Sequence, residues 1–300
     1  MNILITGACG FLGRNLVEHL AHSDHHLTLV DLQNTTVKGH LVHAVDAVHE
    51  HSRLSALMEG KDIVIHAANK ARINPSWDHF GLYYDINITG SQNALRTAQH
   101  HGVKKFVYIS SSSVYGNVPG PQAETDIPMP TNPYGVSKMA AEHALRVQAQ
   151  QGDTELIIVR PFCMYGEFMD NGAEALVLSK FITAWAEGMP LILDGDGLQT
   201  RDFIHATDAV KGLMLIVEHS RHGDVFNLGS GETVSIKALA DIVSDLHVRK
   251  SKRIGHVDCT HANINKLKQL GFEPKVKVQE WLTNAIQDLK LKNPQSQGNK

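Results

Sequence analysis

The 300-residue sequence predicts an α/β fold: a doubly wound parallel sheet with a smaller C-terminal lobe. Short apolar or β-branched runs alternate with longer amphipathic stretches up to about residue 160. A glycine-rich turn follows the first run, and the alternation stops near residue 162. Because alternating strands and helices form right-handed βαβ units, we expect parallel strands covered by helices on both faces.

The expected elements follow one another in chain order. Strands are expected at residues 2–6, 26–32, 41–45, 62–66, 103–110 and 155–160. The segments between them have helical spacing of apolar residues, which predicts helices at 11–22, 52–59, 76–100 and 134–151. Later helices are expected at 174–187, 207–219, 235–246 and 278–291, followed by a frayed polar tail at 293–300.

Composition excludes several classes of protein. The 28 Lys and Arg residues oppose 31 Asp and Glu residues, for a net charge of −3, so nucleic acid is not an expected partner. The 19 histidines have no zinc-site spacing, and we expect solvated surface histidines and no metal. Cys9, Cys163 and Cys259 are odd in number and far apart, which favours a reducing, cytoplasmic compartment. No apolar run approaches the length of a membrane span, so no membrane is expected.

Three glycines, Gly7, Gly10 and Gly13, lie between the first strand and the first helix, in a motif that also contains Phe11 and Leu12. This arrangement gives a tight turn, a close backbone approach and helix N-terminal amides, which together suit a pyrophosphate. Asp31 ends the second strand, where a carboxylate can accept hydrogen bonds from an adenosine ribose diol. Because no arginine follows Asp31, the sequence predicts a Rossmann domain that binds NAD rather than NADP.

Tyr134 and Lys138 are four residues apart in a helix that Pro133 begins, after Thr131 or Asn132 as a cap. This spacing places the phenol and the ammonium on one helix face. A neighbouring cation favours the phenolate, so Tyr134 can remove a hydroxyl proton while hydride leaves the same carbon.

The chain resembles the extended short-chain dehydrogenase/reductase family, in its branch of nucleotide-sugar epimerases and dehydratases. The resemblance extends from residue 1 to about residue 290. Besides the two motifs above, it rests on HisAlaAla at 66–68, AsnIleThrGlySerGlnAsn at 87–93, the Ser-rich ValTyrGly motif at 110–116, the segment at 194–205 and AsnLeuGlySerGlyGlu at 227–232.

The resemblance implies a role for each matching residue. Tyr134 is the general base, Lys138 binds the nicotinamide ribose and polarises Tyr134, and Ser111 hydrogen-bonds the reacting oxygen, with Ser112 as the alternative. The remaining implied contacts are Asp46 near the adenine, Ala67 and Ala68 beside the cofactor, Asn87 as a brace of the active-site backbone, and Arg201 on the substrate diphosphate.

Several positions depart from the family pattern. Ser112 and Ser113 stand where the 4,6-dehydratases carry an acidic pair, which disfavours dehydration. Cys163 replaces the usual Asn, and Asp258 falls where a second diphosphate arginine is usual. Asp258 is expected to repel a phosphate. Four basic residues nearby either compensate for its negative charge or form only a solvated basic face: Arg249, Lys250, Lys252 and Arg253. Asn69 and Arg72 are also unusual, and they are placed where a sugar can touch them.

The implied function is NAD-dependent epimerisation of a nucleotide-diphosphate sugar through a keto sugar. The alternatives are a net dehydrogenase or reductase with the same Ser-Tyr-Lys triad, without a diphosphate on its substrate, and a non-catalytic NAD-binding regulator. We expect an NAD-binding domain at 1–165 with parts of about 200–230 returning to it, a substrate-binding lobe at 166–199 and 231–292, and a homodimer formed through the helices after residues 76 and 134.

Overall fold

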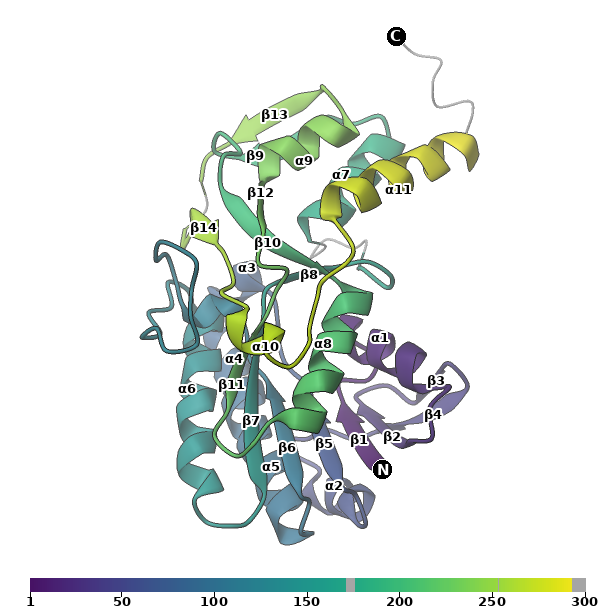
Figure 1. The fold of residues 1–300 in the computed structure, drawn as a ribbon, viewed down its shortest axis with the longest axis vertical. Coiled ribbons are helices and arrows are strands. Elements are labelled where there is room, and N and C mark those ends of the chain that lie inside the picture. The colour runs from purple at the N-terminus through teal and green to yellow at the C-terminus, as the bar shows by residue number, and fades with distance from the viewer. Residues whose placement is uncertain (171–175, 253, 293–300) are drawn as a thin grey trace.

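The computed structural model describes residues 1–170, 176–252 and 254–292 (Figure 1). Its large sheet has eight strands in the order β11-β7-β6-β5-β1-β2-β4-β3, parallel except for β3. These strands are β1 (Asn2–Thr6), β2 (His26–Asp31), β3 (Thr35–Val37), β4 (His40–Ala44), β5 (Ile63–His66), β6 (Lys105–Ile109), β7 (Glu155–Pro161) and β11 (Val225–Leu228). The strand order reverses beside β1, which confirms the doubly wound fold.

Helices cover both faces of the large sheet. On one face, α1 (Phe11–Leu20) packs with α8 (Ala206–His219) over an apolar cluster that includes Leu16 and Leu213. On the other, α5 (Ser91–His100) packs between α2 (His51–Met58) and α6 (Pro133–Ala149) over a cluster that includes Leu95 and Leu145. Both faces are therefore sealed from water, and the open edge for chemistry is the carboxyl end of the strands.

A second body of structure lies above the sheet in Figure 1 and has an apolar core of its own. Two small sheets belong to it, made of β8 (Cys163–Tyr165), β10 (Thr200–His205), β12 (Thr233–Ser235) and β14 (Cys259–Thr260), and of β9 (Leu191–Asp194) with β13 (His247–Lys250). Its helices are α7 (Val177–Ala186), α9 (Ile236–Val243) and α11 (Val278–Lys292), while α10 (Asn265–Lys268) contacts β11.

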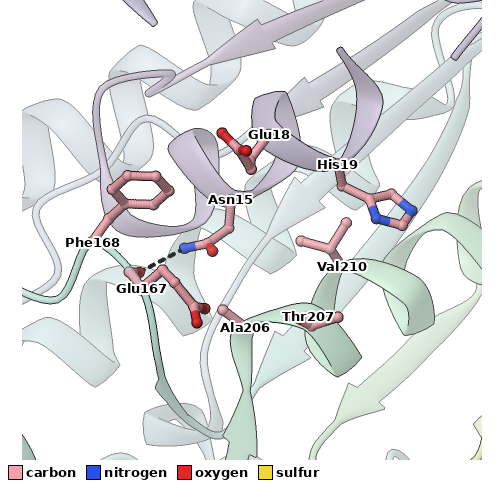
Figure 2. A pocket seen from close by; sticks show the side chains of 8 residues that line it. All are labelled: Asn15, Glu18, His19, Glu167, Phe168, Ala206, Thr207 and Val210. Carbon is pink, nitrogen blue, oxygen red and sulfur yellow. Dashed lines mark hydrogen bonds between the residues drawn. The ribbon is translucent and has the colours of Figure 1, made fainter. Parts of the chain in front are cut away.

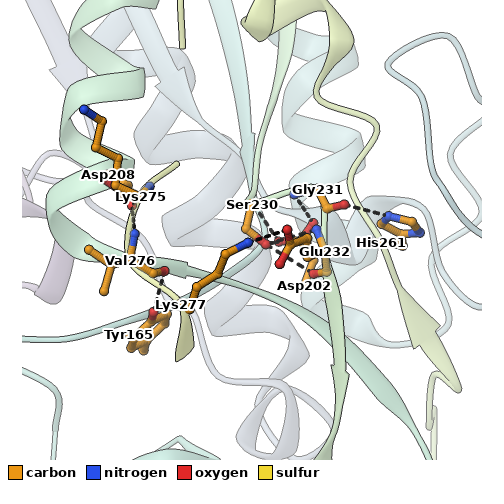
Figure 3. Close-up of polar contacts among 10 residues, drawn as sticks. All are labelled: Tyr165, Asp202, Asp208, Ser230, Gly231, Glu232, His261, Lys275, Val276 and Lys277. Atoms are coloured by element: carbon orange, nitrogen blue, oxygen red, sulfur yellow. Dashed lines mark hydrogen bonds and ion pairs between the residues drawn. The ribbon is translucent and has the colours of Figure 1, made fainter. Parts of the chain in front are cut away.

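Asp202 ties the turns of this upper body to strand β10. Its fully buried carboxylate accepts hydrogen bonds from the backbone amides of Ser230 (2.6 Å), Gly231 (2.9 Å) and Ala262 (3.0 Å) and from the Ser230 hydroxyl (2.8 Å). Figure 3 shows the contacts with Ser230 and Gly231. Burial raises the pKa of Asp202 above its usual value, although these hydrogen bonds oppose the rise. The neighbouring Arg201 is thereby held on a fixed strand.

The continuous helix expected at 76–100 is wrong. The chain forms α3 (Ile73–Ser76), α4 (Phe80–Tyr84), a π-helical turn η1 (Asp85–Gly90) and then α5. Strands β3 and β11 and the small sheets were not expected either. Except for the six-residue β10, these strands are runs of two to four residues, which carry little periodicity. Residues 174 and 175 of the expected helix 174–187, the tail 293–300 and Arg253 lie outside the described residues.

No helix within the described ranges has the length and apolar character needed to cross a lipid bilayer.

Candidate active site

The candidate site is built at the carboxyl edge of the sheet, where neighbouring strands end in register. Thr6 of β1 is opposite both Val30 of β2 and His66 of β5. The residues that follow these strand ends, Gly7 after β1 and Ala67 after β5, consequently meet at one edge. This is the crevice in which open α/β sheets bind ligands.

The glycine turn leaves no room for side chains. Gly7 has φ +70°, and a Cβ on it would lie 2.6 Å from the Ala68 amide nitrogen and 2.7 Å from the Ala67 carbonyl carbon. A Cβ on Gly13 would lie 2.2 Å from the Gly7 oxygen. Gly10 precedes α1, and no side chain caps the helix amides there. The turn is therefore a backbone cradle that fits the pyrophosphate of NAD.

Asp31 braces this cradle. Its carboxylate accepts hydrogen bonds from the Cys9 amide (2.8 Å) and the Leu32 amide (2.7 Å). An ionised carboxylate has about four acceptor positions, so about two remain for a ribose diol. Asp46 follows β4 at the same edge and accepts from the Val48 amide (2.8 Å). Burial raises the pKa of Asp46, but hydrogen bonds from His49 and from backbone amides outweigh it and lower the pKa overall.

Asp31 should make the protein select NAD over NADP, since its negative charge repels a ribose phosphate and Leu32, which carries no charge, follows it. We expect cofactor-free protein to bind NAD at least about tenfold more tightly, and Asp31→Asn to remove most of that difference. Calorimetric titration with both cofactors measures it, with Asp24→Asn on the exposed surface as the control. Equal affinities in the wild type would contradict the assignment.

The π-helical turn places Asn87 between two parts of the site. The buried Asn87 amide accepts from the Lys70 amide (2.8 Å) and donates to the Lys70 carbonyl (3.0 Å) and to Ser137 Oγ (2.9 Å). Ser137 in turn donates to the Tyr134 carbonyl (2.7 Å). Asn87 therefore fastens the loop after β5 to helix α6, which agrees with the occurrence of π-bulges at functional sites.

Helix α6 begins after Asn132, one of the two residues that the sequence offered as its cap. Asn132 accepts from the Gly135 amide (2.9 Å), and Pro133 occupies the first turn. The Tyr134 amide donates to Ser76 Oγ (3.2 Å), and the Tyr134 side chain is 7% exposed. Burial raises the pKa of Tyr134 to about 12, while a hydrogen bond with Ser111 and the charge of Arg72 lower it. The structure thus brings Ser111, rather than Ser112, to the phenol.

Lys138 lies on the buried side of α6, one turn after Tyr134. Its ammonium donates to the Ile109 carbonyl (2.6 Å) and lies 4.5 Å from the centre of the Tyr108 ring. Burial lowers the pKa of Lys138 to about 7, against the effect of the Glu142 carboxylate, which raises it. The end of β6 therefore fixes the position of the ammonium.

A buried charge network lies behind the triad. Glu142 binds Arg160 in two places, Oε2 to Nη2 at 2.6 Å and Oε1 to Nε at 2.9 Å, and also accepts from Ser110 Oγ (2.6 Å). Arg160 donates further to the Tyr115 hydroxyl (2.9 Å). The Glu142 and Arg160 side chains are 1% and 2% exposed, so this fork connects α6 rigidly to β7.

His66 stands beneath the site between two hydroxyls. Its Nδ1 is 2.8 Å from Thr6 Oγ1 and its Nε2 is 3.1 Å from Ser91 Oγ. Burial first, and the charge of Lys138 second, lower the pKa of His66 to about 3. His66 is therefore neutral in the folded protein at neutral pH.

This neutral histidine predicts loss of stability in mild acid. In the unfolded chain His66 binds a proton below about pH 6.5, whereas in the folded chain it binds one only below about pH 3. The free energy of unfolding therefore decreases as the pH is lowered between these values. From about pH 7.5 to about pH 5 the loss from His66 is about 2 kcal/mol. Urea unfolding at both pH values should show a shallower dependence for His66→Gln. Equal dependences would refute the assignment.

Arg201 and Cys163 come together on adjacent strands. Cys163 of β8 pairs with Phe203 of β10, and burial raises the pKa of its thiol, against the charge of Arg201. Two donors of the Arg201 guanidinium bind the carbonyls of Thr200 (2.7 Å) and Val257 (2.6 Å). A guanidinium has five donors, so its position is fixed while donors remain for a ligand.

Asp258 is held by its neighbours. Its carboxylate is 3.1 Å from Lys252 Nζ and 3.2 Å from Asn117 Nδ2, and these hydrogen bonds lower the pKa of Asp258. The Lys252 stem lies against Gly195, where a Cβ would approach its Cγ to 2.9 Å. The negative charge of Asp258 is thus paired with the ammonium of Lys252, one of the four basic residues that the sequence offered to compensate for it.

A cavity of about 360 Å³ lies between α1, the turn after β8 and the start of α8 (Figure 2). Asn15 spans it, because its amide donates to the Glu167 carbonyl (3.0 Å). The described residues that line it, which include none of the predicted site residues, are Asn15, Glu18, His19, Glu167, Phe168, Ala206, Thr207 and Val210. The cavity is therefore separate from the triad.

Sequence reasoning missed the supports of the triad. The motifs singled out Tyr134 and Lys138, but Ser76, Tyr83 and Glu142 belong to none of these motifs. Tyr83 donates to the Arg72 carbonyl (2.6 Å), and its ring is 6.3 Å from that of Tyr134. Of these three, only Glu142 had a sequence signal: an acid four residues beyond Lys138, on the same helix face.

Residues 3–229 match the model of the NAD dependent epimerase/dehydratase family. The chain is 31% identical to an uncharacterized UDP-glucose epimerase, YtcB, of Bacillus subtilis strain 168, over 95% of this chain and 97% of that protein. It is 28% identical to a dTDP-glucose 4,6-dehydratase of Streptomyces griseus, over 95% of this chain and 93% of that protein. The solved structure of MoeE5 in complex with UDP-glucuronic acid and NAD superposes with a TM-score of 0.89 at 30% identity, over 98% of this chain and all of that one.

Proposed function

The chain belongs to the NAD-dependent epimerase/dehydratase family, and from this premise we propose that it epimerises a nucleoside-diphosphate sugar with NAD. The observation that carries the proposal is the hydrogen bond between Ser111 and Tyr134, with Lys138 one helical turn after Tyr134 and bonded to the end of β6, at the sheet edge that also carries the glycine cradle. We propose UDP as the nucleotide, since YtcB is named for UDP-glucose and MoeE5 was solved with UDP-glucuronic acid.

In this proposal each residue of the triad has a separate task. Tyr134 removes a proton from a sugar hydroxyl, and Ser111, bonded to the phenol, holds the same oxygen. Lys138 stabilises the phenolate and binds the nicotinamide ribose. NAD, when bound, would accept the hydride from that carbon and return the hydride to the other face of the keto sugar. The proposed cofactor contacts are Gly7, Gly10, Phe11, Leu12, Gly13, Asp31, Asp46, Ala67, Ala68 and Asn87.

Epimerisation fits the residues around Tyr134 better than dehydration. Removal of water requires a second acid and base, yet Ser112 and Ser113 follow Ser111. We therefore favour turnover of the keto sugar followed by return of hydride.

Arg201 is proposed to hold the substrate diphosphate, with Ser112 and Cys163 nearer the sugar. Arg201→Ala should weaken UDP by roughly 1.5 to 3 kcal/mol, the scale for hydrogen bonds to a charged group, with solvent exposure reducing the loss. Asp258→Arg should tighten UDP or leave it unchanged. Calorimetric titration decides: equally weak binding of UDP by the wild type and Arg201→Ala would refute the diphosphate contact.

The reaction is tested by incubating the NAD-loaded protein with UDP-sugars and separating the products. We expect an epimer of unchanged mass and no steady accumulation of reduced cofactor. Loss of the mass of water would indicate dehydration. Steady growth of the absorbance of the reduced cofactor would indicate the net dehydrogenase, whose support is the departure at Cys163.

We also propose a cytoplasmic homodimer. Its contact surface would be the outer side of α4 and α6, where Phe80 (58%), Tyr84 (36%) and Val147 (65%) are exposed apolar side chains. The three cysteines are free, as expected in a reducing compartment. Sedimentation at several concentrations tests the dimer, and a monomer throughout would refute it.

A further inference from the structure

Arg72 has a fixed backbone beside the proposed catalytic tyrosine. It precedes α3, and its carbonyl accepts the hydrogen bond from the buried Tyr83 hydroxyl (2.6 Å). The Tyr83 ring packs edge-on against the Tyr134 ring, with 6.3 Å between their centres. At the other end of α3, Ser76 accepts from the Tyr134 amide. Two independent contacts thus hold this short segment against Tyr134.

The Arg72 side chain is largely withdrawn from water, with 27% of it exposed. Its positive charge reaches the phenol, because it lowers the pKa of Tyr134 against the dominant effect of burial. The guanidinium and the phenol therefore lie in one region of the site. A ligand whose hydroxyl is placed on Tyr134 brings its neighbouring substituents towards Arg72.

The ion pair that Arg72 forms is loose. Its Nη2 is 3.6 Å from Asp170 Oδ2, longer than the 2.7 to 2.9 Å typical of a direct charge-assisted hydrogen bond. The Asp170 side chain is 50% exposed, and exposed pairs contribute little free energy. Replacing this pair at the Arg72 guanidinium by a pair with another carboxylate therefore costs Arg72 little.

A neutral sugar would not make use of this arrangement. Its hydroxyls would leave a mostly buried cation with a long pair to a half-exposed acid, whereas a planar carboxylate matches the guanidinium fork with two parallel hydrogen bonds. At the other part of the proposed site, Arg201 is the cation proposed for the diphosphate. Arg72 is a separate cation, near the reacting hydroxyl.

We propose that the substrate is a nucleoside-diphosphate hexuronic acid and that Arg72 binds its sugar carboxylate in exchange for Asp170. This inference rests on the proposed function. It assigns Arg72 as the residue that determines specificity for an acidic sugar.

The test compares UDP, UDP-glucose and UDP-glucuronic acid by calorimetric titration of the NAD-loaded protein. We expect the wild type to bind UDP-glucuronic acid about 10- to 100-fold more tightly than UDP-glucose, the range for a hydrogen-bonded charge pair. Arg72→Met, which keeps the length of the stem, should abolish this preference and leave the affinity for UDP unchanged. Arg221→Met, in the exposed turn before β11, is the matched control and should retain the preference.

The outcomes separate the two proposals. If the wild type binds UDP but not UDP-glucuronic acid in preference to UDP-glucose, the carboxylate assignment fails and the proposed function stands. If Arg72→Met weakens UDP itself, Arg72 contacts the diphosphate and the assignment also fails. If the wild type binds none of the three compounds, the proposed function fails.

Asp170→Asn provides a second test should Arg72→Met not fold. Removing the competing carboxylate should tighten UDP-glucuronic acid by up to about fivefold, the scale of a surface ion pair, and leave UDP-glucose unchanged. An unchanged affinity for both compounds would overturn the exchange.

Discussion

Tyr134→Phe should lower turnover by at least about two orders of magnitude, the usual scale for loss of a general acid or base. The substitution removes one hydroxyl from a side chain that is 7% exposed, and its ring contact with Tyr83 remains. Fold and cofactor affinity should therefore be preserved. Initial rates with the UDP-sugar that the product assay shows to react, alongside thermal unfolding and NAD titration, measure the three quantities.

Tyr84→Phe is the matched control, since Tyr84 is 36% exposed and belongs to the outer side of α4. It should turn over at the wild-type rate. Near wild-type turnover of Tyr134→Phe would show that another group removes the proton, and Ser111, the hydroxyl bonded to the phenol, would be the next to substitute.

Glu142→Leu should lower the free energy of unfolding by about 3 to 5 kcal/mol, because it leaves a buried guanidinium without its counter-ion. Arg160 is 2% exposed, and Glu142 accepts two of its hydrogen bonds. Urea unfolding measures the loss. The cause is separated from simple loss of packing by the double variant Glu142→Leu with Arg160→Met, which should regain most of the stability.

The same variant should act on the triad. Glu142 raises the pKa of Lys138, so its removal moves that pKa further below about 7 and leaves the lysine less charged. For the stability prediction, a loss of unfolding free energy smaller than about 1 kcal/mol in Glu142→Leu, or no recovery in the double variant, would show that the Glu142–Arg160 pair does not support the fold as we infer.

The sequence predicted those parts of the fold and the candidate site that have a repeating or spaced pattern. β1 and β7 contain unbroken apolar runs, at residues 3–5 and 156–159, and the glycine triplet requires its turn wherever it follows a strand. Tyr134 and Lys138 share a helix face because four residues make about one turn.

What the sequence did not predict depends on contacts between distant residues. The π-helical turn at Asp85–Gly90 has helical spacing on both sides, and its distortion becomes visible only when Asn87 meets Lys70 and Ser137. Likewise, the sequence placed Lys252 among four basic residues that could compensate for Asp258, but which of them meets it, and that Asn117 also does, is set by folding and not by spacing.

Strand β11 is translated well after its partner β7, and this delay affects how the protein folds during synthesis. It pairs with β7, as Val225 opposite Ile158, but residues 162–224 must leave the ribosome between the two strands. Until then the nascent chain presents β7, an apolar strand, as an unpaired edge, which is a template for aggregation. Substitutions in the intervening lobe can therefore reduce the yield of folded protein during translation even where they leave the stability of the finished molecule unchanged.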